Sequence, residues 1–184
     1  QDVVDDTDGL ISLREAILYA AAGDTILFDA ALAGGTITLR GTRLEIRRGI
    51  TIDATEIGGI TIDGTGRSRV FYVTGGTVED PVDLVALTIT GGKTTGDGGG
   101  LYNRGTLTLT GCTVSGNTAE YSDGGGIYNG GTLTLIDCTI SGNTAYSGGG
   151  IYNRGTLTLT NCVIAGNTAY SGGGIYNYCD NDGT

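Results

Sequence analysis

A phrase of 24 residues recurs almost unchanged through the second half of the chain. Copies begin at Gly98, Gly124 and Gly148, a fourth opens at Gly172, and the first is two residues longer than the next two. A unit this short cannot bury an apolar face by itself, but stacked copies bury a continuous core. The repetition therefore predicts a solenoid in which each copy forms one coil.

Alternating threonine and leucine residues indicate strands within each copy. The segment 106–110 reads Thr-Leu-Thr-Leu-Thr, and its counterparts at 132–136 and 156–160 keep both leucines. This period of two places the leucines on one face of a strand and the threonines on the other. We expect two or three short strands per copy, separated by Gly and Asn turns. Parallel pairing between successive coils then gives an all-β fold, a right-handed parallel β-helix (β-solenoid).

Stacking also predicts columns of identical polar residues. Two asparagine columns and one tyrosine column are expected: Asn103, Asn129, Asn153 and Asn177; Asn117, Asn143 and Asn167; and Tyr102, Tyr128, Tyr152 and Tyr176. Asparagine amides can hydrogen-bond along a column and satisfy backbone groups of buried turns. An asparagine row can also bind a ligand, but the structural interpretation is favoured.

The first half of the chain follows the same plan with less regularity. Strand-like runs occupy 36–39, 50–54, 60–64, 70–73 and 84–90. We interpret residues 1–184 as a single β-helix domain of about seven coils. Its parts are an N-terminal cap segment (1–34), degenerate coils (35–97) and regular coils of about 24 residues (98–184).

The segment 12–23 has the features of a short α-helix. Ser12 and Glu15 have the spacing of a capping box, and Gly23 is expected to end the helix. The apolar face comprises Leu13, Ile17, Ala20 and Ala21. Such a helix would cap the first coil, whose strand edges need cover.

The composition narrows the range of partners and cellular locations. The chain has ten cationic and twenty acidic residues, and no methionine. The acidic balance argues against nucleic acid as a partner, although most arginines lie between Arg40 and Arg69 and could form a local basic patch. The absence of methionine predicts a longer precursor; a removed secretory signal fits best, and a proteolytic fragment of a larger protein is the alternative. No stretch approaches the ~20 apolar residues that cross a bilayer, so we expect a secreted or cell-surface protein without membrane insertion.

Two stretches resemble known bacterial surface proteins. Residues 6–17 read Asp-Thr-Asp-Gly-Leu-Ile-Ser-Leu-Arg-Glu-Ala-Ile and, with 23–28, resemble the N-terminal module named for its Cys-Ser-Leu-Arg-Glu-Ala (CSLREA) signature. Ile11 replaces the cysteine, so any role of that cysteine is lost. The Gly-Gly-Gly-Ile-Tyr-Asn and Ser-Gly-Asn-Thr-Ala phrases are similar to repeats of the polymorphic outer membrane proteins. The resemblance implies a right-handed β-helix outside a bacterial cell, but no single activity.

Few residues are candidates for chemistry, and none is assigned as catalytic, cofactor-binding or metal-ligating. Asp53 and Asp63 lie in matching Ile-Thr-Ile-Asp phrases and could stack as a carboxylate pair, with Arg67 or Arg69 nearby. Polysaccharide-degrading enzymes use such clusters, but outward residues at strand ends are the favoured interpretation. Without histidine, Ser-His-Asp and Cys-His systems are excluded, and we expect no enzymatic activity.

A partial calcium-loop pattern lies near the N-terminus. Asp6, Asp8, Gly9 and Glu15 match four of its positions, but Val4 stands where the first ligand belongs. Glu15 is already expected in the capping box. We therefore expect no cofactor, with calcium near Asp6 and Asp8 as the alternative.

The outward threonines form a regular grid in this arrangement. They occupy positions 106, 108, 110, 132, 134, 156, 158 and 160. The grid resembles the faces of ice-binding β-solenoids. However, threonine is also a favoured solvent-side residue of strands, and Ile136 interrupts the array.

Three of the four cysteines share one repeat position. Cys112, Cys138 and Cys162 should form a column, in which either one adjacent pair is a disulfide or all remain buried thiols. Cys179 falls outside the column, so it is either free or bonded to another chain.

These observations favour an extracellular structural protein, a rod that assembles head to tail into a cell-surface or extracellular filament. The expected partner is another copy of the chain, because an uncovered strand edge invites further pairing. The alternative is a surface adhesin or passenger domain that binds glycans or neighbouring cell surfaces. A polysaccharide-degrading enzyme and an ice-binding protein follow as further alternatives.

Overall fold

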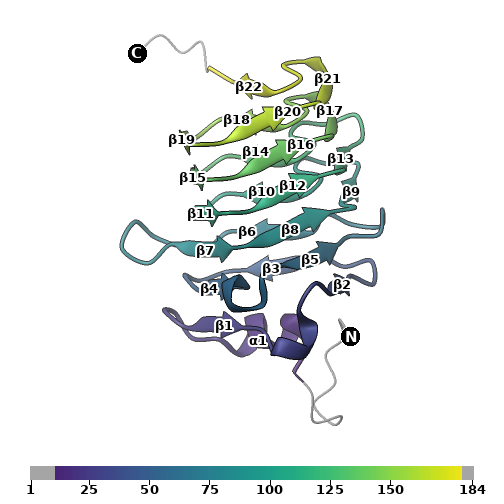
Figure 1. The fold of residues 1–184 in the computed structure, drawn as a ribbon. Helices are drawn as coiled ribbons and strands as arrows, with labels where there is room; N and C mark the ends of the chain where they lie inside the picture. Colours follow the sequence, from purple (N-terminus) through teal and green to yellow (C-terminus); the bar gives the residue numbers. More distant parts are fainter. Residues whose placement is uncertain (1–10, 180–184) are drawn as a thin grey trace.

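The computed structural model describes residues 11–179, which form a stack of six coils (Figure 1). The chain rises from helix α1 (Leu13–Tyr19) at one end to strand β22 (Ile175–Asn177) at the other. The sequence-based count of seven coils is wrong, because the phrases 50–54 and 60–64 are two strands of one coil.

Three parallel sheets of six strands run the length of the stack, and a fourth sheet has four strands. Sheet A contains β1 (Thr25–Leu27), β4 (Thr51–Asp53), β7 (Val82–Val85), β11 (Thr106–Thr110), β15 (Thr132–Ile136) and β19 (Thr156–Thr160). Sheet B contains β2 (Thr36–Thr38), β5 (Ile60–Asp63), β8 (Leu87–Thr90), β12 (Thr113–Ser115), β16 (Thr139–Ser141) and β20 (Val163–Ala165). Sheet C contains β3 (Leu44–Ile46), β6 (Phe71–Val73), β10 (Leu101–Asn103), β14 (Ile127–Asn129), β18 (Ile151–Asn153) and β22.

Sheet D contains β9 (Lys93–Thr94), β13 (Thr118–Ala119), β17 (Thr144–Ser147) and β21 (Thr168–Ser171). It begins only at the third coil, so the first two coils have three strands and the next four have four. The expectation of two or three strands per regular copy is therefore too low. The missed strand lies in the Asn-Thr-Ala phrase, where a two- to four-residue run pairs with its copy in the next coil.

The strands stack in the register that the repeat predicts. Leu109 pairs with Leu135, which pairs with Leu159, and the neighbouring leucines of sheet A form a second column. Leu109 and Leu135 are fully buried, in one continuous core that runs through the stack. The alternation of inward leucine and outward threonine therefore determines which residues form the core.

The corner between sheets A and B needs left-handed backbone in successive coils. Gly111, Asp137 and Asn161 occupy this corner with φ values of 60°, 54° and 52°. Glycine, asparagine and aspartate tolerate that conformation best among the residues. The choice of residue here thus reflects the sharp turn between two strands.

Helix α1 closes one end of the core, as expected. Ser12 Oγ accepts a hydrogen bond from Glu15 N, and Ser12 N donates to Glu15 Oε2, which confirms the capping box. The helix ends at Tyr19 and not at Gly23, because Ala20 leaves the helical conformation and Ala21 N donates to Asp24 Oδ2. Ala21 is consequently exposed instead of lying on the apolar face.

Two short 3₁₀ turns, Ala30–Leu32 and Thr55–Ile57, complete the described elements. No helix within residues 11–179 is long and apolar enough to cross a membrane.

Candidate functional site

The proposed carboxylate pair does not form, because its two members belong to different sheets. Asp53 is in sheet A beside Val85, whereas Asp63 is in sheet B beside Thr90. Each carboxylate instead accepts a hydrogen bond of 2.7 Å from a backbone N–H two residues later in the chain. Both aspartates end their strands and cap local turns, so the favoured interpretation is confirmed and the alternative of a carboxylate pair is wrong.

Two other acidic residues, Asp97 and Asp123, lie close together in successive coils. Asp123 N donates to Asp97 Oδ1 at 3.3 Å, and Ser122 Oγ donates to the same oxygen. Burial raises the pKa of Asp123, and the neighbouring Asp97 charge raises it further. Between residues 11 and 179 no group of three His, Cys, Asp or Glu side chains gathers in a metal-binding arrangement. Asp6 and Asp8, the calcium alternative, lie outside the described residues.

The asparagine columns are structural, as the sequence predicts. Asn103 Nδ2 donates to Asn129 Oδ1 at 2.8 Å, and Asn129 Nδ2 donates to Asn153 Oδ1 at 2.7 Å. The second column repeats the pattern from Asn117 to Asn143 at 3.0 Å. These amides form hydrogen bonds with one another and with the backbone of turns, so they are not available to bind a ligand.

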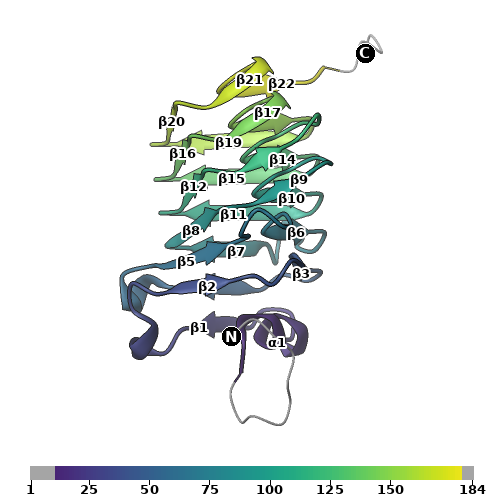
Figure 2. The ribbon, with the colours of Figure 1, turned by 90° about the vertical axis from the view of Figure 1, so that its right-hand side faces the viewer.

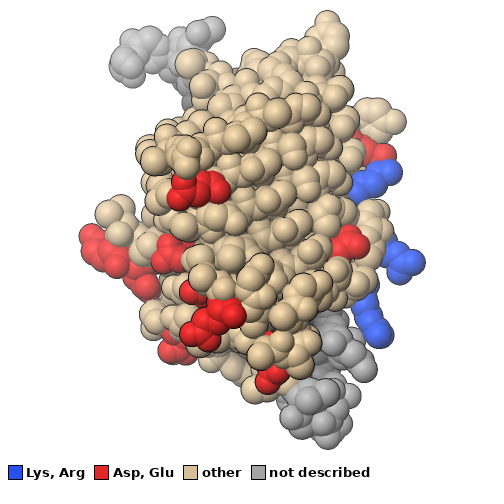
Figure 3. All heavy atoms as spheres, viewed as in Figure 1, with Lys and Arg blue, Asp and Glu red and all other residues tan. Residues whose placement is uncertain are grey.

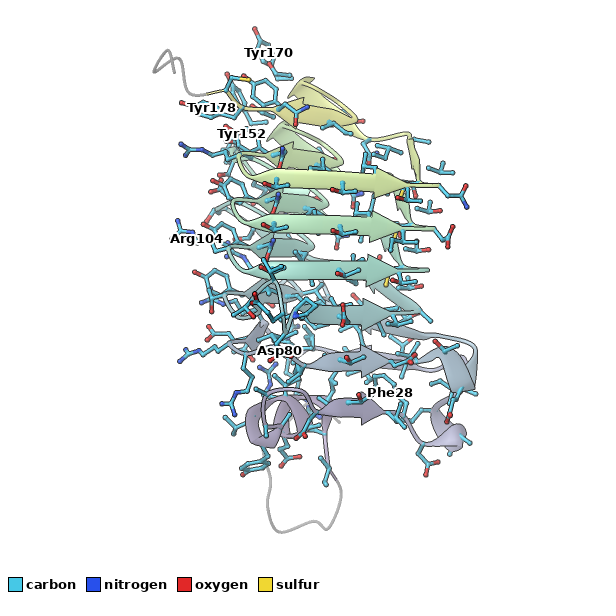
Figure 4. The ribbon with its side chains drawn as sticks, turned by 90° about the vertical axis from the view of Figure 1, so that its left-hand side faces the viewer. Phe28, Asp80, Arg104, Tyr152, Tyr170 and Tyr178 are labelled. Atoms are coloured by element: carbon cyan, nitrogen blue, oxygen red, sulfur yellow. The ribbon has the colours of Figure 1, made fainter. Side chains whose placement is uncertain are left out.

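The tyrosine column is longer than predicted and carries arginines along its side. It includes Tyr72, and successive ring centroids lie 5.0, 4.8, 5.4 and 5.2 Å apart. Arg104 lies over Tyr102 and Arg154 over Tyr178, along the margin where Figure 4 labels Arg104, Tyr152 and Tyr178. Burial raises the pKa of Tyr152 to about 12.

The four cysteines are all free thiols. Cys112, Cys138 and Cys162 form the expected column, and each Sγ donates to a backbone carbonyl of the preceding coil at 3.3 to 3.4 Å. Cys179 is exposed and lies outside that column. Of the alternatives drawn from the sequence, the structure contains the thiol ladder.

The threonine grid is present on sheet A, which Figure 4 faces. Thr106, Thr132 and Thr156 stand in register, as do the threonines two residues later in each strand. Ile136 interrupts the third row. The regularity follows from strand register alone, so it does not by itself indicate ice binding.

A groove of about 1110 Å³ opens among the described residues. Its lining comes from α1, from the first two coils and from β9, elements that Figure 2 shows one above another along one side of the stack. Those coils lack a fourth strand, and every lining residue except Glu120 belongs to the irregular half of the chain (1–97).

Most of the cationic side chains of this acidic protein line the groove. Seven of the ten are Arg14, Arg43, Arg47, Arg48, Arg67, Arg69 and Lys93. Only two carboxylates, Glu45 and Glu120, join them, so the described lining carries five positive charges net. In Figure 3 the lysine and arginine side chains in view lie along one margin, whereas acidic side chains are spread over the face.

The cations of the groove differ in how they are paired. Glu45 Oε1 contacts Arg43 and its Oε2 contacts Arg47, both at 2.7 Å, and these hydrogen bonds lower the pKa of Glu45. Lys93 pairs with Glu120 at 2.7 Å. Arg48 donates instead to the carbonyl of Ala20. The Glu45 carboxylate is thus shared by two guanidinium groups.

Arg69 holds the most unusual position among them. Its guanidinium lies 5.5 Å from the centroid of Tyr72 and 5.1 Å from that of Tyr102, and it forms no salt bridge with any residue in 11–179. Burial, followed by the positive charge of Arg43, lowers the pKa of Arg69. The buried atoms Arg69 Nε and Ser68 Oγ also lack hydrogen-bond partners.

The comparison with protein families gives a match to "Right handed beta helix region" over residues 48–184. The chain belongs to this right-handed β-helix family. The match covers well over half of the chain and confirms the predicted fold, including its handedness. Neither the curated proteins nor the solved structures gave a match.

The sequence of this β-helix indicated a local basic patch but no function for it. The available signal was spacing, since Arg43, Arg67 and Lys93 are 24 and 26 residues apart, which is the length of one coil. Residues separated by one coil length fall on the same side of the rod.

Proposed function

We propose that this β-helix is a non-enzymatic structural rod that associates end to end with further copies of itself. The supporting observation is where large apolar side chains are exposed. Five are near the α1 end, namely Ile11, Leu18, Tyr19, Leu27 and Leu32, and four are in the last coil, namely Leu159, Val163, Tyr170 and Tyr178. Only Val78, Tyr121 and Tyr146 of this class lie between them in the described residues. Apolar surface concentrated at two ends favours contacts through those ends.

The last coil supports this proposal in its details. Leu159 is 38% exposed, although Leu109 and Leu135 in the same column are fully buried. Within residues 11–179 nothing pairs with the outer edges of β19, β20, β21 and β22. Another coil laid on these edges would continue the leucine columns and satisfy the backbone groups. Contact between unlike ends does not close on itself, so repeated addition gives a filament.

The proposal also assigns the polar side chains to structure and not to catalysis. Asparagine and cysteine side chains of the columns form hydrogen bonds with neighbouring coils, and the tyrosine rings stack on the rings of neighbouring coils. A location outside a bacterial cell follows from the resemblance to surface-protein modules and repeats, and it is part of the proposal.

End-to-end association is tested by changing one end and leaving the side intact. The protein, 18.7 kDa as a monomer, is examined at micromolar concentrations by size-exclusion chromatography with light scattering and by negative-stain microscopy. We expect filaments or large oligomers, and we expect L159K/I164K to give monomers, because Leu159 and Ile164 continue interior columns in the last coil and two charges would enter the contact.

Val78→Lys is the matched control, since Val78 is 80% exposed but lies in a side loop between β6 and β7. It should assemble like the unchanged protein. A monodisperse monomer at every concentration contradicts the proposal, as does equal loss of assembly in the control.

A further inference from the structure

We propose that the groove below β9 binds a saccharide carrying sulfate or phosphate ester groups, and that Arg69 is its principal anion-binding residue. The inference does not depend on end-to-end association, because Ser68 and Arg69 lie between β5 and β6 of the second coil; of the exposed apolar residues at the α1 end, Leu18 alone also lines the groove. It is built from three observations: unpaired donors, unbalanced charge, and the size and polarity of the lining.

The first observation is the pair of unpaired polar atoms at adjacent positions. Ser68 Oγ and Arg69 Nε are both buried without a hydrogen-bond partner. Buried polar groups in proteins are almost always paired, so such atoms call for a specific explanation. Both residues line the groove, and rotation of the Arg69 side chain toward it would bring its donors to an anionic oxygen.

The second observation is the excess of positive charge around Arg69. Arg43 lies over the same Tyr72 ring at 4.1 Å, so two guanidinium groups share one aromatic neighbour. Glu45 neutralises only part of this charge, because Arg43 and Arg47 share it. An oxyanion between the guanidinium groups would remove their mutual repulsion and accept the forked hydrogen bonds that arginine offers.

The third observation concerns the extent of the groove. Its volume of about 1110 Å³ exceeds the range of ~300–1,000 Å³ that holds a drug-sized ligand. The lining contains the hydroxyl groups of Thr42, Ser68, Thr94 and Thr95 in addition to the cations. Hydroxyl groups and guanidinium groups together match a ligand of several units that carries both hydroxyls and acidic esters.

Two competing ligand classes fit less well. Single-stranded nucleic acid needs open aromatic faces on which bases stack, whereas Tyr72 and Tyr102 are stacked on each other and covered by arginines. A planar carboxylate offers two oxygens, but a sulfate or phosphate ester offers three. Three oxygens allow simultaneous contact with Ser68, Arg69 and a third cation.

The test is isothermal titration calorimetry of the full chain with a heparin hexasaccharide and with a phosphorylated mannose oligosaccharide, which separates sulfate from phosphate. An unsulfated heparosan oligosaccharide of equal length retains only carboxylates. We expect measurable binding of at least one esterified probe that weakens as salt is raised, and little binding of heparosan.

Variants assign the binding to Arg69. We expect R69A to weaken binding of the esterified probe by about 10- to 100-fold, because a charged hydrogen bond is lost. R69K, which keeps the charge but not the fork, should lie between R69A and the unchanged protein. R67A changes an exposed lining residue and should weaken binding without affecting the fold.

Arg154→Ala is the matched control, because Arg154 also lies over a tyrosine but is far from the groove. It should bind the probe as well as the unchanged protein. Equal loss in R154A and R69A, equal affinity for heparosan, tighter binding of single-stranded DNA or a phosphopeptide, or no binding of any probe would each overturn the proposal. Circular dichroism of every variant separates loss of the site from loss of the fold.

Discussion

Replacing Asn129 by alanine tests whether the asparagine column stabilises the rod. Asn129 is fully buried and its amide bridges three coils. Its Oδ1 accepts from Asn103 and from Gly131 N, and its Nδ2 donates to Asn153 and to the Thr156 carbonyl. Alanine can make none of these contacts.

The magnitude follows from the groups left without partners. Gly131 N and Asn153 Oδ1 each lose the hydrogen bond that Asn129 supplies. An unsatisfied buried group costs about 1–3 kcal/mol, so the free energy of unfolding should fall by about 4 kcal/mol in N129A. That is a large fraction of the ~5–15 kcal/mol by which proteins are stable.

Asn177 provides the comparison, because it ends the same column and is exposed. Water can replace its contacts, so N177A should cost about 1 kcal/mol or less. The assay is urea unfolding followed by far-UV circular dichroism, with midpoint and slope fitted for each variant. If the two variants lose equal stability, the column does not stabilise the rod in the way described.

Three further predictions concern other parts of the molecule. The hydrogen bond with the Cys138 thiol, together with burial, raises the pKa of Cys112, so a thiol reagent should modify exposed Cys179 rapidly and Cys112 only after unfolding. Ser12→Ala should lower stability by about 1 kcal/mol by removing the N-cap, measured by thermal unfolding, with loss confined to the α1 end in hydrogen exchange. Two arginines lower the pKa of Glu45, so its stabilising effect is present at neutral pH and is lost as pH falls through that pKa. Glu45→Gln should therefore lower the melting temperature near neutral pH but leave it unchanged in strong acid.

The regular half of the fold could be predicted because the sequence repeat determines the register of its strands. Identical residues 24 or 26 positions apart stack, and this rule correctly placed Leu109, Leu135 and the asparagine columns. The capping box was also predictable, since Ser12 and Glu15 interact across one helical turn. Each of these features depends on short-range or strictly periodic contacts.

The irregular half could not be predicted in the same way. Asp53 and Asp63 have matching neighbours but are ten residues apart, less than one coil, so they fall on different sheets. The groove was not predicted because it lies beside two coils that lack a strand of sheet D. No sequence motif indicates that this strand is absent. The unpaired donors of the groove, at Ser68 and Arg69, are visible only in three dimensions.

The two extra residues of the first regular copy show where a β-helix of this kind can accept insertions. They are absorbed near Tyr121, whose backbone is left-handed (φ 61°), and the strands that follow return to register by Ile127. Corners therefore accept insertions, while whole copies can be duplicated without creating a new kind of contact. Each duplication would lengthen the molecule by about 4.8 Å. The length of the rod can thus change during evolution in steps of one coil.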